Sequence, residues 1–413
     1  IKKGDGFRPN SGFDSKNLFT KITHDFNDNT KVSAEVTYLD YLAQQAGGLT
    51  DNLFKENPYQ SNRERNWFGL NWFLYNIKFE HTFSKKSNMS VNVFGLDAER
   101  KAIGFRSNRV DQIDSNEERD LIKGDFNNYG IEIRWLQNYS LGNKKAVFLV
   151  GGKYYKAKNT SAQGPGSASS DADFSFYKNR YPNYNQQSYY TYPNKNLAMF
   201  VENIFYLSEK LSFTPGMRYE NILTSSDGSF KKINTDAAGN VILNETISAN
   251  KSRKRSFVLF GLGASYKVNK SLEFYANFSQ NYRSVTFTDI SIINPAFSIN
   301  PNITDEKGNT FDLGIRGKIK KILSFDLNLF NISYKNRIGF VQKVDRFNSV
   351  KSERGNVGNA RLYGIESLMD INFVSWLKMD STKYALSSFL NYSYINSEYI
   401  STEKSGIEGN KVE

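Results

Sequence analysis

The stretch that decides the fold runs from Leu211 to Glu220 and reads LSFTPGMRYE. Each odd position holds an apolar or aromatic residue, and each even position holds a polar residue or glycine. Successive side chains of a β-strand point to opposite faces, so this period of two predicts a strand with one apolar and one polar face. The same alternation recurs at residues 32–38, 272–279 and 310–316, and no stretch shows a comparable helical period. We therefore expect an all-β fold.

About 14 strands of this kind are expected, with boundaries good to a few residues. They lie near residues 17–26, 31–43, 66–82, 89–103, 125–138, 145–157, 196–206, 211–222, 255–268, 271–284, 309–319, 322–338, 358–375 and 383–398. Seven short polar links alternate with six longer connections, most of them roughly 20 to 40 residues long. The short links are 27–30, 84–88, 141–144, 207–210, 269–270, 320–321 and the stretch around 378–380. Transmembrane barrels have short periplasmic turns and long extracellular loops, so we expect a transmembrane antiparallel up-and-down β-barrel segment.

Composition excludes several other classes of protein. The 413 residues include no Cys, which rules out disulfide scaffolds, thiolate zinc sites and cysteine nucleophiles. They include only two His, so a His-based metal site or general base is poorly supplied. No run of about 18 apolar residues exists, so membrane helices are not expected. His81 lies near Ser84, but no acidic third member of a triad accompanies them, and we expect no enzyme activity.

The net charge of +12 raises the question of nucleic acid. Many lysines fall in the short links, where solvated turns account for them, so no nucleic-acid partner is expected. A run of six tyrosines from Tyr177 to Tyr192 could stack on sugars, or could pack within its own loop.

Both ends of the chain suggest a partial barrel. It begins Ile1-Lys2-Lys3 with no signal peptide, and it finishes on a polar tail instead of an aromatic-ended strand. About 14 strands also fall short of the roughly 22 strands of the large plugged barrels. We expect residues 1–413 to be one barrel domain from which an N-terminal plug and C-terminal strands are absent.

Four segments carry a resemblance to a known family. Residues 200–220, FVENIFYLSEKLSFTPGMRYE, resemble a mid-barrel hairpin of TonB-dependent outer-membrane receptors, in which an F-x-E/Q strand turns into a T-P-G-x-R-Y/F-E strand. The other three are residues 281–288 with Asn294-Pro295, residues 311–316 (FDLGIR) and residues 359–366 (NARLYGIE). Their order and spacing also fit the family, over residues 1 to about 400.

Three further segments resemble the ferric dicitrate receptor branch of that family. They are residues 4–13 (GDGFRPNSGF), 44–51 (QQAGGLTD) and 61–68 (SNRERNWF), with Asn57-Pro58 between the last two. The resemblance implies energised import of a ferric chelate across the cell outer membrane, with ferric citrate or a similar siderophore as cargo. It implies a TonB–ExbB–ExbD energising complex, acting through the absent plug region, and contact with outer-membrane lipid and lipopolysaccharide. It implies no resident cofactor, because the iron travels as part of the chelate.

Candidate binding residues lie in the long connections, since an Arg guanidinium suits carboxylate-rich chelates. The candidates are Gln44, Gln45, Arg63, Arg65, Arg106 and Arg109, with Arg119 and Arg180 further on. Tyr59, Trp67 and Phe68 could wall the site. Each Arg could instead pair with a nearby acid (Glu64, Asp111, Glu117, Glu118 or Asp120) or contact lipopolysaccharide phosphate. No catalytic or metal-ligating residue is assigned.

Two other functions stay open at this point. A passive outer-membrane porin would share the strand pattern, and so would an adhesin or a barrel that captures surface glycans. A plug encoded upstream would decide for the energised importer, and glycan binding without binding of ferric citrate would favour the capture function.

Overall fold

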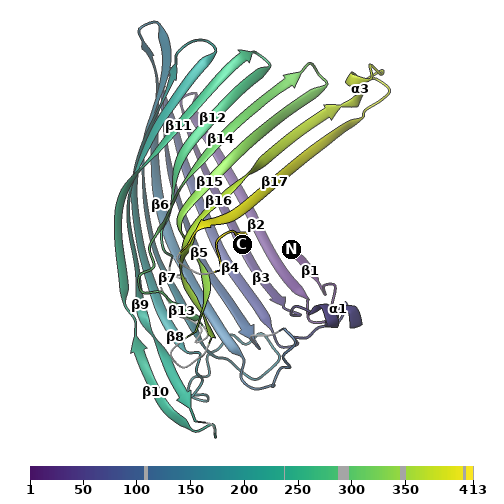
Figure 1. The fold of residues 1–413 in the computed structure, drawn as a ribbon, viewed down its shortest axis with the longest axis vertical. Helices are drawn as coiled ribbons and strands as arrows, with labels where there is room; N and C mark the ends of the chain where they lie inside the picture. Colours follow the sequence, from purple (N-terminus) through teal and green to yellow (C-terminus); the bar gives the residue numbers. More distant parts are fainter. Residues whose placement is uncertain (107–109, 237, 287–296, 345–349, 403–405, 413) are drawn as a thin grey trace.

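The computed structural model describes all residues except 107–109, 237, 287–296, 345–349, 403–405 and 413. The described residues form one 17-stranded sheet and two short helices (Figure 1). The elements of the first half are β1 (Lys2–Gly4), β2 (Phe13–Asn27), β3 (Thr30–Gln44), α1 (Asp51–Glu56), β4 (Trp67–Ser84), β5 (Ser87–Gly104), β6 (Asp120–Leu141), β7 (Lys144–Pro165), β8 (Ser188–Tyr206) and β9 (Leu211–Thr235). Those of the second half are β10 (Val241–Ser248), β11 (Lys251–Asn269), β12 (Leu272–Arg283), β13 (Phe297–Ile299), β14 (Glu306–Ile319), β15 (Leu323–Val344), β16 (Val350–Asn372), α3 (Phe373–Trp376) and β17 (Ser387–Ser401).

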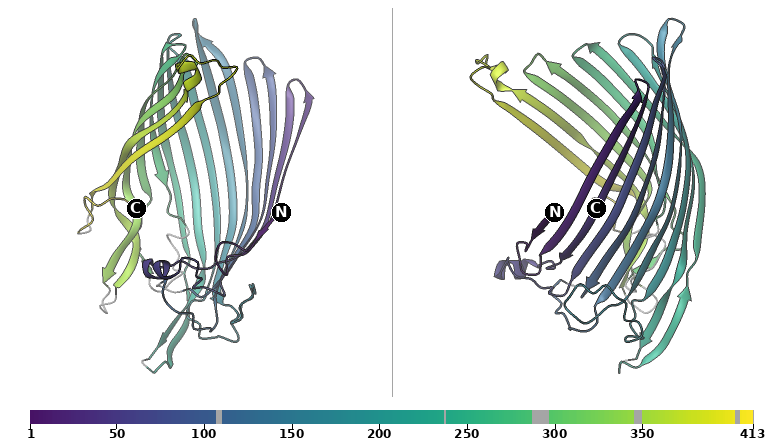
Figure 2. Two further views of the ribbon diagram at one scale, coloured as in Figure 1. Left: turned by 90° about the vertical axis from the view of Figure 1, so that its right-hand side faces the viewer. Right: turned by 180° about the vertical axis from the view of Figure 1, so that it is seen from behind.

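Each long strand pairs antiparallel with the next along the chain. The registers run from β2 with β3, through β9 with β11 and β12 with β14, to β16 with β17. Two short strands lie at one end of the wall. β10 pairs antiparallel with residues 229–235 of β9, and β13 pairs in parallel with residues 352–354 of β16. Figure 2 shows the sheet curving around an open side that lies between β2 and β17. The fold is thus an up-and-down barrel wall, as expected.

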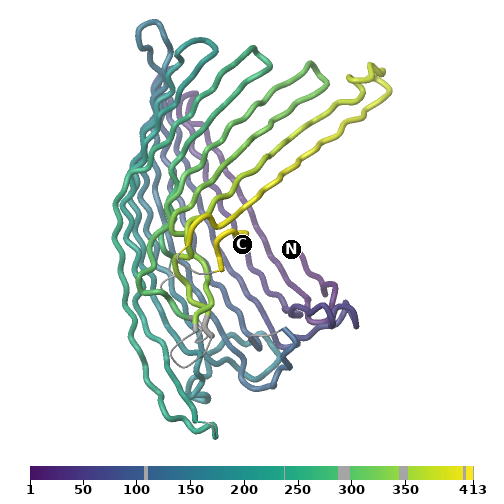
Figure 3. Tube along the Cα trace, viewed as in Figure 1, coloured from purple at the N-terminus to yellow at the C-terminus, as the bar shows by residue number. Residues whose placement is uncertain are grey.

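The two ends of the wall differ in how the strands are joined. At the upper end in Figure 3 the chain reverses in tight hairpins, and at the lower end the connections are longer. Side chains close several of the tight turns: Asn27 accepts from the amide of Asn29 at 2.9 Å, and Asn269 accepts from the amide of Ser271 at 2.8 Å. Such local bonds replace ladder bonds at a reversal, which explains why Asn and Ser occur there. We call the lower end the long-link end.

The outer face of the wall is an exposed apolar belt. On β6 the alternate residues Tyr129, Ile131, Ile133 and Trp135 are all exposed, while the intervening side chains face the interior. The same alternation exposes Val258, Phe260, Leu262 and Tyr266 on β11. So many large apolar side chains on one surface would be a liability in water, but they match the lipid-facing band of a membrane barrel. The described residues contain no helix that is both long enough and apolar enough to cross a membrane.

The strands that the sequence predicts are confirmed, although many are longer than predicted. Setting aside the short β1, β10 and β13 leaves fourteen long strands, one for each predicted segment. The extension is mostly toward the long-link end: the strand expected at 145–157 is β7, which continues to Pro165, and the one expected at 211–222 is β9, which continues to Thr235. Backbone pairing continues past the lipid, but the apolar and polar alternation stops where both faces meet water. The long connections are correspondingly shorter than predicted.

The predicted length of one short link is wrong. The strand expected at 358–375 ends at Asn372, and residues 373–386 form a longer connection that contains α3. Asn372 caps this helix by accepting from the amide of Ser375 at 2.9 Å. A single turn of helix has too little periodicity to be recognised in the sequence.

Candidate functional site

At the long-link end, Arg119 joins three connections into one unit. Its side chain is fully buried, and its guanidinium donates to the carbonyls of Arg65 (2.8 Å), Ser167 (3.0 Å) and Asp171 (2.7 Å). It also donates to the hydroxyls of Ser167 (2.7 Å) and Ser169 (3.1 Å). A guanidinium carries five N–H donors spread over a plane, whereas an ammonium group carries three on one nitrogen, so only the guanidinium can satisfy five separate acceptors. We call the joined connections, 45–66, 105–119 and 166–187 in their described parts, the loop cluster.

Arg65 ties the same three connections by a second route. Its Nε lies 2.9 Å from a carboxylate oxygen of Asp114, and Nη1 donates to the carbonyls of Glu117 (3.0 Å) and Ala168 (2.8 Å). Burial by itself would raise the pKa of the Asp114 carboxyl. Hydrogen bonds from Arg65 and the Asn116 amide, with the positive charge of Arg65, outweigh the burial and hold that pKa below its ordinary value.

Arg63 is also turned into the loop cluster. The side chain is buried, and its guanidinium donates to the carbonyls of Asn62 (2.6 Å), Val110 (3.2 Å) and Gln112 (3.1 Å). The guanidinium carbon also lies 5.1 Å from the centre of the Phe105 ring, a cation–π contact. Carbonyl groups take no proton at physiological pH, so these contacts hold the connection in place over a wide pH range.

Asp120 closes the cluster at the start of β6. Its buried carboxylate accepts from Arg106 (3.0 Å), from the amide of Gln163 (2.9 Å) and from the hydroxyl of Tyr184 (3.0 Å). Burial, the Asp120 charge and its hydrogen bond raise the pKa of Tyr184 far above its ordinary value. The Arg106 side chain stays half exposed, so part of its guanidinium faces outward from the cluster.

The other predicted residues differ in exposure and in their contacts. Gln45 and Arg180 are exposed, and Arg180 lies 5.6 Å from the Tyr181 ring centre. Gln44 is half-buried, and its backbone amide donates to the Gly12 carbonyl at 2.9 Å. Arg109 lies outside the described residues. Trp67 donates from its indole to the Ser170 carbonyl at 2.8 Å, Tyr59 packs on Phe7, and Phe68 packs on Tyr41.

The structure therefore brings Arg63, Arg65, Arg106 and Arg119 together but orients them differently. Arg63, Arg65 and Arg119 turn inward and organise the connections, whereas the Arg106 side chain is half exposed beside Asp120. A direct ligand role for Gln44, Gln45, Arg63, Arg65, Arg106 or Arg109 stays a prediction. Among the described residues, no group of three or more His, Cys, Asp or Glu side chains is arranged to hold a metal ion.

A second cluster was not predicted from the sequence. Arg255 on β11 lies 2.7 Å from a carboxylate oxygen of Asp305, which also accepts from the hydroxyl of Tyr282 and, at 2.7 Å, from the amide of Val285. Glu306 beside it accepts from Arg283 at 2.7 Å and from the Ile338 amide at 2.7 Å. Together these contacts hold Asp305 and Glu306, at the start of β14, against β11, β12 and β15. In the sequence, the one sign of this cluster was the pair of adjacent acids, Asp305 and Glu306, just before a predicted strand.

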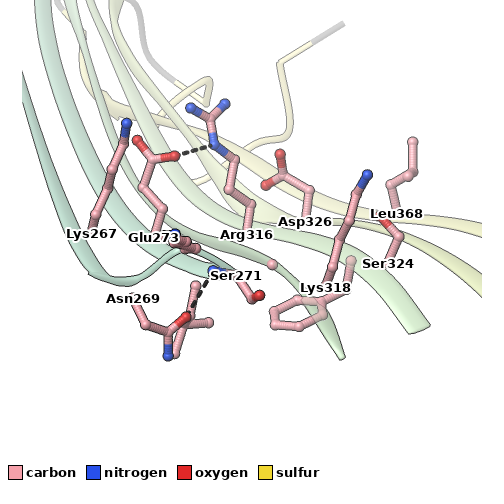
Figure 4. A pocket seen from close by; sticks show the side chains of 13 residues that line it. Lys267, Asn269, Ser271, Glu273, Arg316, Lys318, Ser324, Asp326 and Leu368 are labelled. Carbon is pink, nitrogen blue, oxygen red and sulfur yellow. Dashed lines mark hydrogen bonds and ion pairs between the residues drawn. The ribbon is translucent and has the colours of Figure 1, made fainter. Parts of the chain in front are cut away.

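The interior wall at the opposite end is charged. Figure 4 shows Lys267, Glu273, Arg316, Asp326 and Lys318 projecting to the same side of the sheet. Arg316 donates to Glu273 at 3.0 Å, and the hydroxyl of Tyr275 donates to Asp326 at 2.7 Å. A polar interior behind an apolar exterior is the arrangement of barrels that enclose water or another domain.

Comparison with known proteins decides the family. A family model described as "TonB dependent receptor-like, beta-barrel" matches residues 9–412. This chain belongs to the TonB-dependent receptor family. The proteins of this family are transport receptors of the outer membrane, so the apolar belt faces outer-membrane lipid and the long-link end is the extracellular end.

Individual TonB-dependent receptors are similar to this chain in sequence or in fold. An uncharacterized TonB-dependent receptor of Haemophilus influenzae is 24% identical over 190 residues, which is 46% of this chain and 47% of the relative. The unliganded ferric citrate transporter FecA is 20% identical with a TM-score of 0.74, over 98% of this chain and 54% of that one. The ferric yersiniabactin uptake receptor FyuA of Yersinia pestis is 14% identical with a TM-score of 0.68, over 97% and 56%. The chain thus spans about half the length of these relatives, and the structural likenesses show the fold alone.

Proposed function

We propose that this barrel serves the energised import of a ferric chelate across the outer membrane, with the loop cluster as part of the chelate-binding surface. The observation that carries the proposal is the loop cluster itself. Buried guanidiniums fix its shape before any ligand arrives, and the exposed Arg106 and Arg180 add positive charge to its surface. A preformed surface avoids the entropic cost of ordering loops on binding, and Arg suits carboxylate groups.

Ferric citrate is the first candidate cargo. The resemblance of residues 44–51 and 61–68 to the ferric dicitrate branch supports it, as does the likeness to a solved ferric citrate transporter. Other solved relatives are titled as receptors for ferric siderophores, and one is titled a copper transporter, so the class of chelate is tested alongside. In this proposal iron is cargo and not a resident cofactor, and the protein acts as a transport receptor and not as an enzyme.

The energy source follows from the family. We propose that a TonB–ExbB–ExbD complex drives release of the chelate through a plug domain held inside the barrel. The charged interior wall around Glu273, Arg316 and Asp326 offers such a domain a polar surface. The other open functions, a passive porin and a glycan-capturing barrel, have no specific observation in their favour.

Isothermal titration of the whole receptor tests the proposal. Ferric citrate should bind, and Arg106→Ala and Arg180→Ala should each weaken binding by about ten- to a hundredfold if each loses a charge-assisted hydrogen bond worth about 1.5–3 kcal/mol. Arg361→Ala is the matched control, because Arg361 lies on the outer face of β16, away from the loop cluster. A ferric hydroxamate, a ferric catecholate and Cu²⁺ serve as competing ligands. Absence of binding to every ferric chelate would overturn the import proposal, and unchanged affinity in both variants would overturn the site.

A further inference from the structure

A small pocket lies at the long-link end of the wall, where β12, β14 and β15 are neighbours (Figure 1). Its volume is about 240 Å³, below the roughly 300–1,000 Å³ of sites for drug-sized ligands, so a compact ligand fits it better than a whole ferric chelate. We call it the rim pocket, and it is lined by Asn281, Tyr282, Arg283, Glu306, Lys307, Gly308, Tyr334 and Arg337. Cationic side chains outnumber the single anionic one in this lining, so the pocket favours an anion.

Arg337 lines the rim pocket with donors that nothing else uses. Only 25% of its side chain is exposed. Its guanidinium carbon lies 4.9 Å from the centre of the Tyr334 ring, and its Nη1 lies 3.7 Å from Oε2 of Glu306, too far for a hydrogen bond. Within the described part of the chain, this guanidinium takes part in no hydrogen bond, although it carries five N–H donors. Largely buried donors without acceptors are costly, and a bound anion would satisfy them.

A β-bulge places Arg337 at the rim pocket. The register of β15 with β16 shifts on both sides of Arg337, and Asn336 before it has a left-handed backbone with a φ of 57°. Two side chains of β16 hold the bulge: Asn356 donates to the Asn336 carbonyl at 2.6 Å, and Asn359 accepts from the Asn336 amide at 3.2 Å. Bulges redirect a side chain and often lie beside functional sites. The strained backbone of Asn336 is thus kept where it positions an arginine with unmet donors.

Glu306 determines which anions suit the rim pocket. The residue is only 1% exposed, and its Oε1 accepts from Arg283 and from the Ile338 amide, both at 2.7 Å. Its Oε2 is buried and has no hydrogen-bond partner among the described residues. A buried acceptor without a donor is costly, so a ligand that keeps an O–H group gains a hydrogen bond here. A fully ionised anion would only bring its charge against the carboxylate.

We propose that the rim pocket binds hydrogen phosphate, with its anionic oxygens on Arg337 and Arg283 and its O–H group on Oε2 of Glu306. Guanidinium groups suit phosphate oxygens, which they can bind in pairs. Inorganic phosphate keeps one proton near neutral pH and sulfate keeps none, so Glu306 distinguishes two anions of the same shape. The exposed Lys307 adds positive charge at the edge of the pocket. This site lies on other strands than the loop cluster and is separate from the proposed chelate-binding surface.

Isothermal titration of the whole receptor in detergent, at pH 8 and constant ionic strength, tests the rim pocket. Inorganic phosphate should bind the wild type, and sulfate should bind about tenfold more weakly or less. Arg337→Gln should weaken phosphate binding about tenfold or more, because it removes charge-assisted hydrogen bonds. Arg361→Gln removes a charge from the outer face of β16 and should bind phosphate like the wild type.

A second variant tests the role of Glu306 in selectivity. In Glu306→Gln the amide oxygen can still accept from Arg283 and Ile338, but an N–H group replaces Oε2. The preference for phosphate over sulfate should therefore fall about tenfold or more, since the new group donates to either anion. Folding of each variant is checked by its heat-modifiable migration in gels. If Glu306→Gln does not fold, the comparison of phosphate with sulfate on the wild type tests the same role.

Two further ligands identify the source of the phosphate. A phosphomonoester such as glycerol phosphate has a second pKa of about 6, so at pH 8 it has lost the proton that Glu306 needs and should bind more weakly than inorganic phosphate. Equal binding of sulfate by the wild type, or unchanged phosphate affinity in Arg337→Gln, would overturn the proposal. Tighter binding of metal-free citrate than of phosphate would do the same, because it would assign the pocket to a hydroxycarboxylate. Ferric citrate is titrated separately, so failure of the chelate site and failure of the rim pocket are told apart.

Discussion

Single buried guanidinium groups determine the shape of the extracellular end, and Arg119 is the most enclosed of them. Its five side-chain hydrogen bonds reach the other two connections of the loop cluster, 45–66 and 166–187. In the sequence, this arginine stands in a row of charges between Glu118 and Asp120 and looks like an exposed ligand candidate. Only the folded connections bring backbone carbonyls around it, because those carbonyls come from residues about 50 positions away on either side.

Replacing Arg119 with Lys should loosen the loop cluster although the charge is kept. An ammonium group cannot reach all five acceptors, and each buried acceptor left unpaired costs about 1–3 kcal/mol. We expect faster amide hydrogen exchange at residues 112–118 and 166–171, and new trypsin cleavage in the cluster. Arg361→Lys on the outer face of β16 should leave both unchanged. Wild-type protection in Arg119→Lys would show that the cluster holds together without this residue.

Acid should loosen the loop cluster once the pH falls low enough to protonate Asp114. The pKa of Asp114 is below its ordinary value of 3.8, so its ion pair with Arg65 contributes fully above that pH and is lost as the pH falls through the lower folded-state pKa. Hydrogen exchange at residues 112–118, corrected for intrinsic rates, should therefore be constant from pH 8 to pH 5 and rise only below about pH 4. In Asp114→Asn the exchange should be faster at neutral pH and should lack this acid step. A step near pH 6 would point to a different titrating group.

At the scale of strands, aromatic side chains lie across glycines of the adjacent strand. The Tyr275 ring of β12 occupies the space over Gly314 of β14, and the Tyr275 hydroxyl donates to Asp326 of β15 at 2.7 Å. Tyr75 of β4 covers Gly95 of β5 in the same manner. The period-two pattern predicts these strands but not the pairs, because register is needed to place a glycine opposite a particular tyrosine.

Replacing Gly314 with Val should therefore destabilise the barrel. A Cβ at this position would collide with the Tyr275 ring, and overpacking of this kind costs about 1–3 kcal/mol. Gly152→Val is the control, since its Cβ would meet nothing closer than the Ala198 carbonyl at 3.6 Å. The measurement is the temperature at which the receptor loses its folded migration in gels. Equal temperatures for both variants would contradict the steric argument.

At the scale of the whole molecule, the two faces of the wall meet different surroundings, lipid outside and a polar interior inside. Leu262 lies in the middle of the outward apolar run of β11 from Val258 to Tyr266, whereas Thr214 of β9 faces the interior. Leu262→Arg should lower the free energy of unfolding by about 2–4 kcal/mol, the cost of an Arg at the bilayer midplane. Thr214→Arg should change it far less, because the interior is polar. Equilibrium unfolding from liposomes compares the two, and equal losses would mean that the faces are assigned wrongly.

The sequence by itself determined the all-β class, the fourteen long strands and which of their faces meets lipid. It could do so because these features depend on nearest neighbours: alternation along a strand and Asn or Ser at a tight turn are local. It also pointed to the family, through short motifs in order. It did not determine how far the strands continue beyond the membrane, since the alternation stops where the lipid stops.

Only the tertiary structure decided which arginines are buried and which are exposed. Arg63, Arg65 and Arg106 all lie in connections that the sequence predicts to be long and polar. The first two are buried and donate into the loop cluster, and the third stays half exposed. The tertiary structure also decided that Lys156 and Lys195, which are 39 positions apart, stand directly opposite each other. Both outcomes depend on contacts between distant segments. Residue types set the chemistry that is available, and register and connection geometry decide which groups meet.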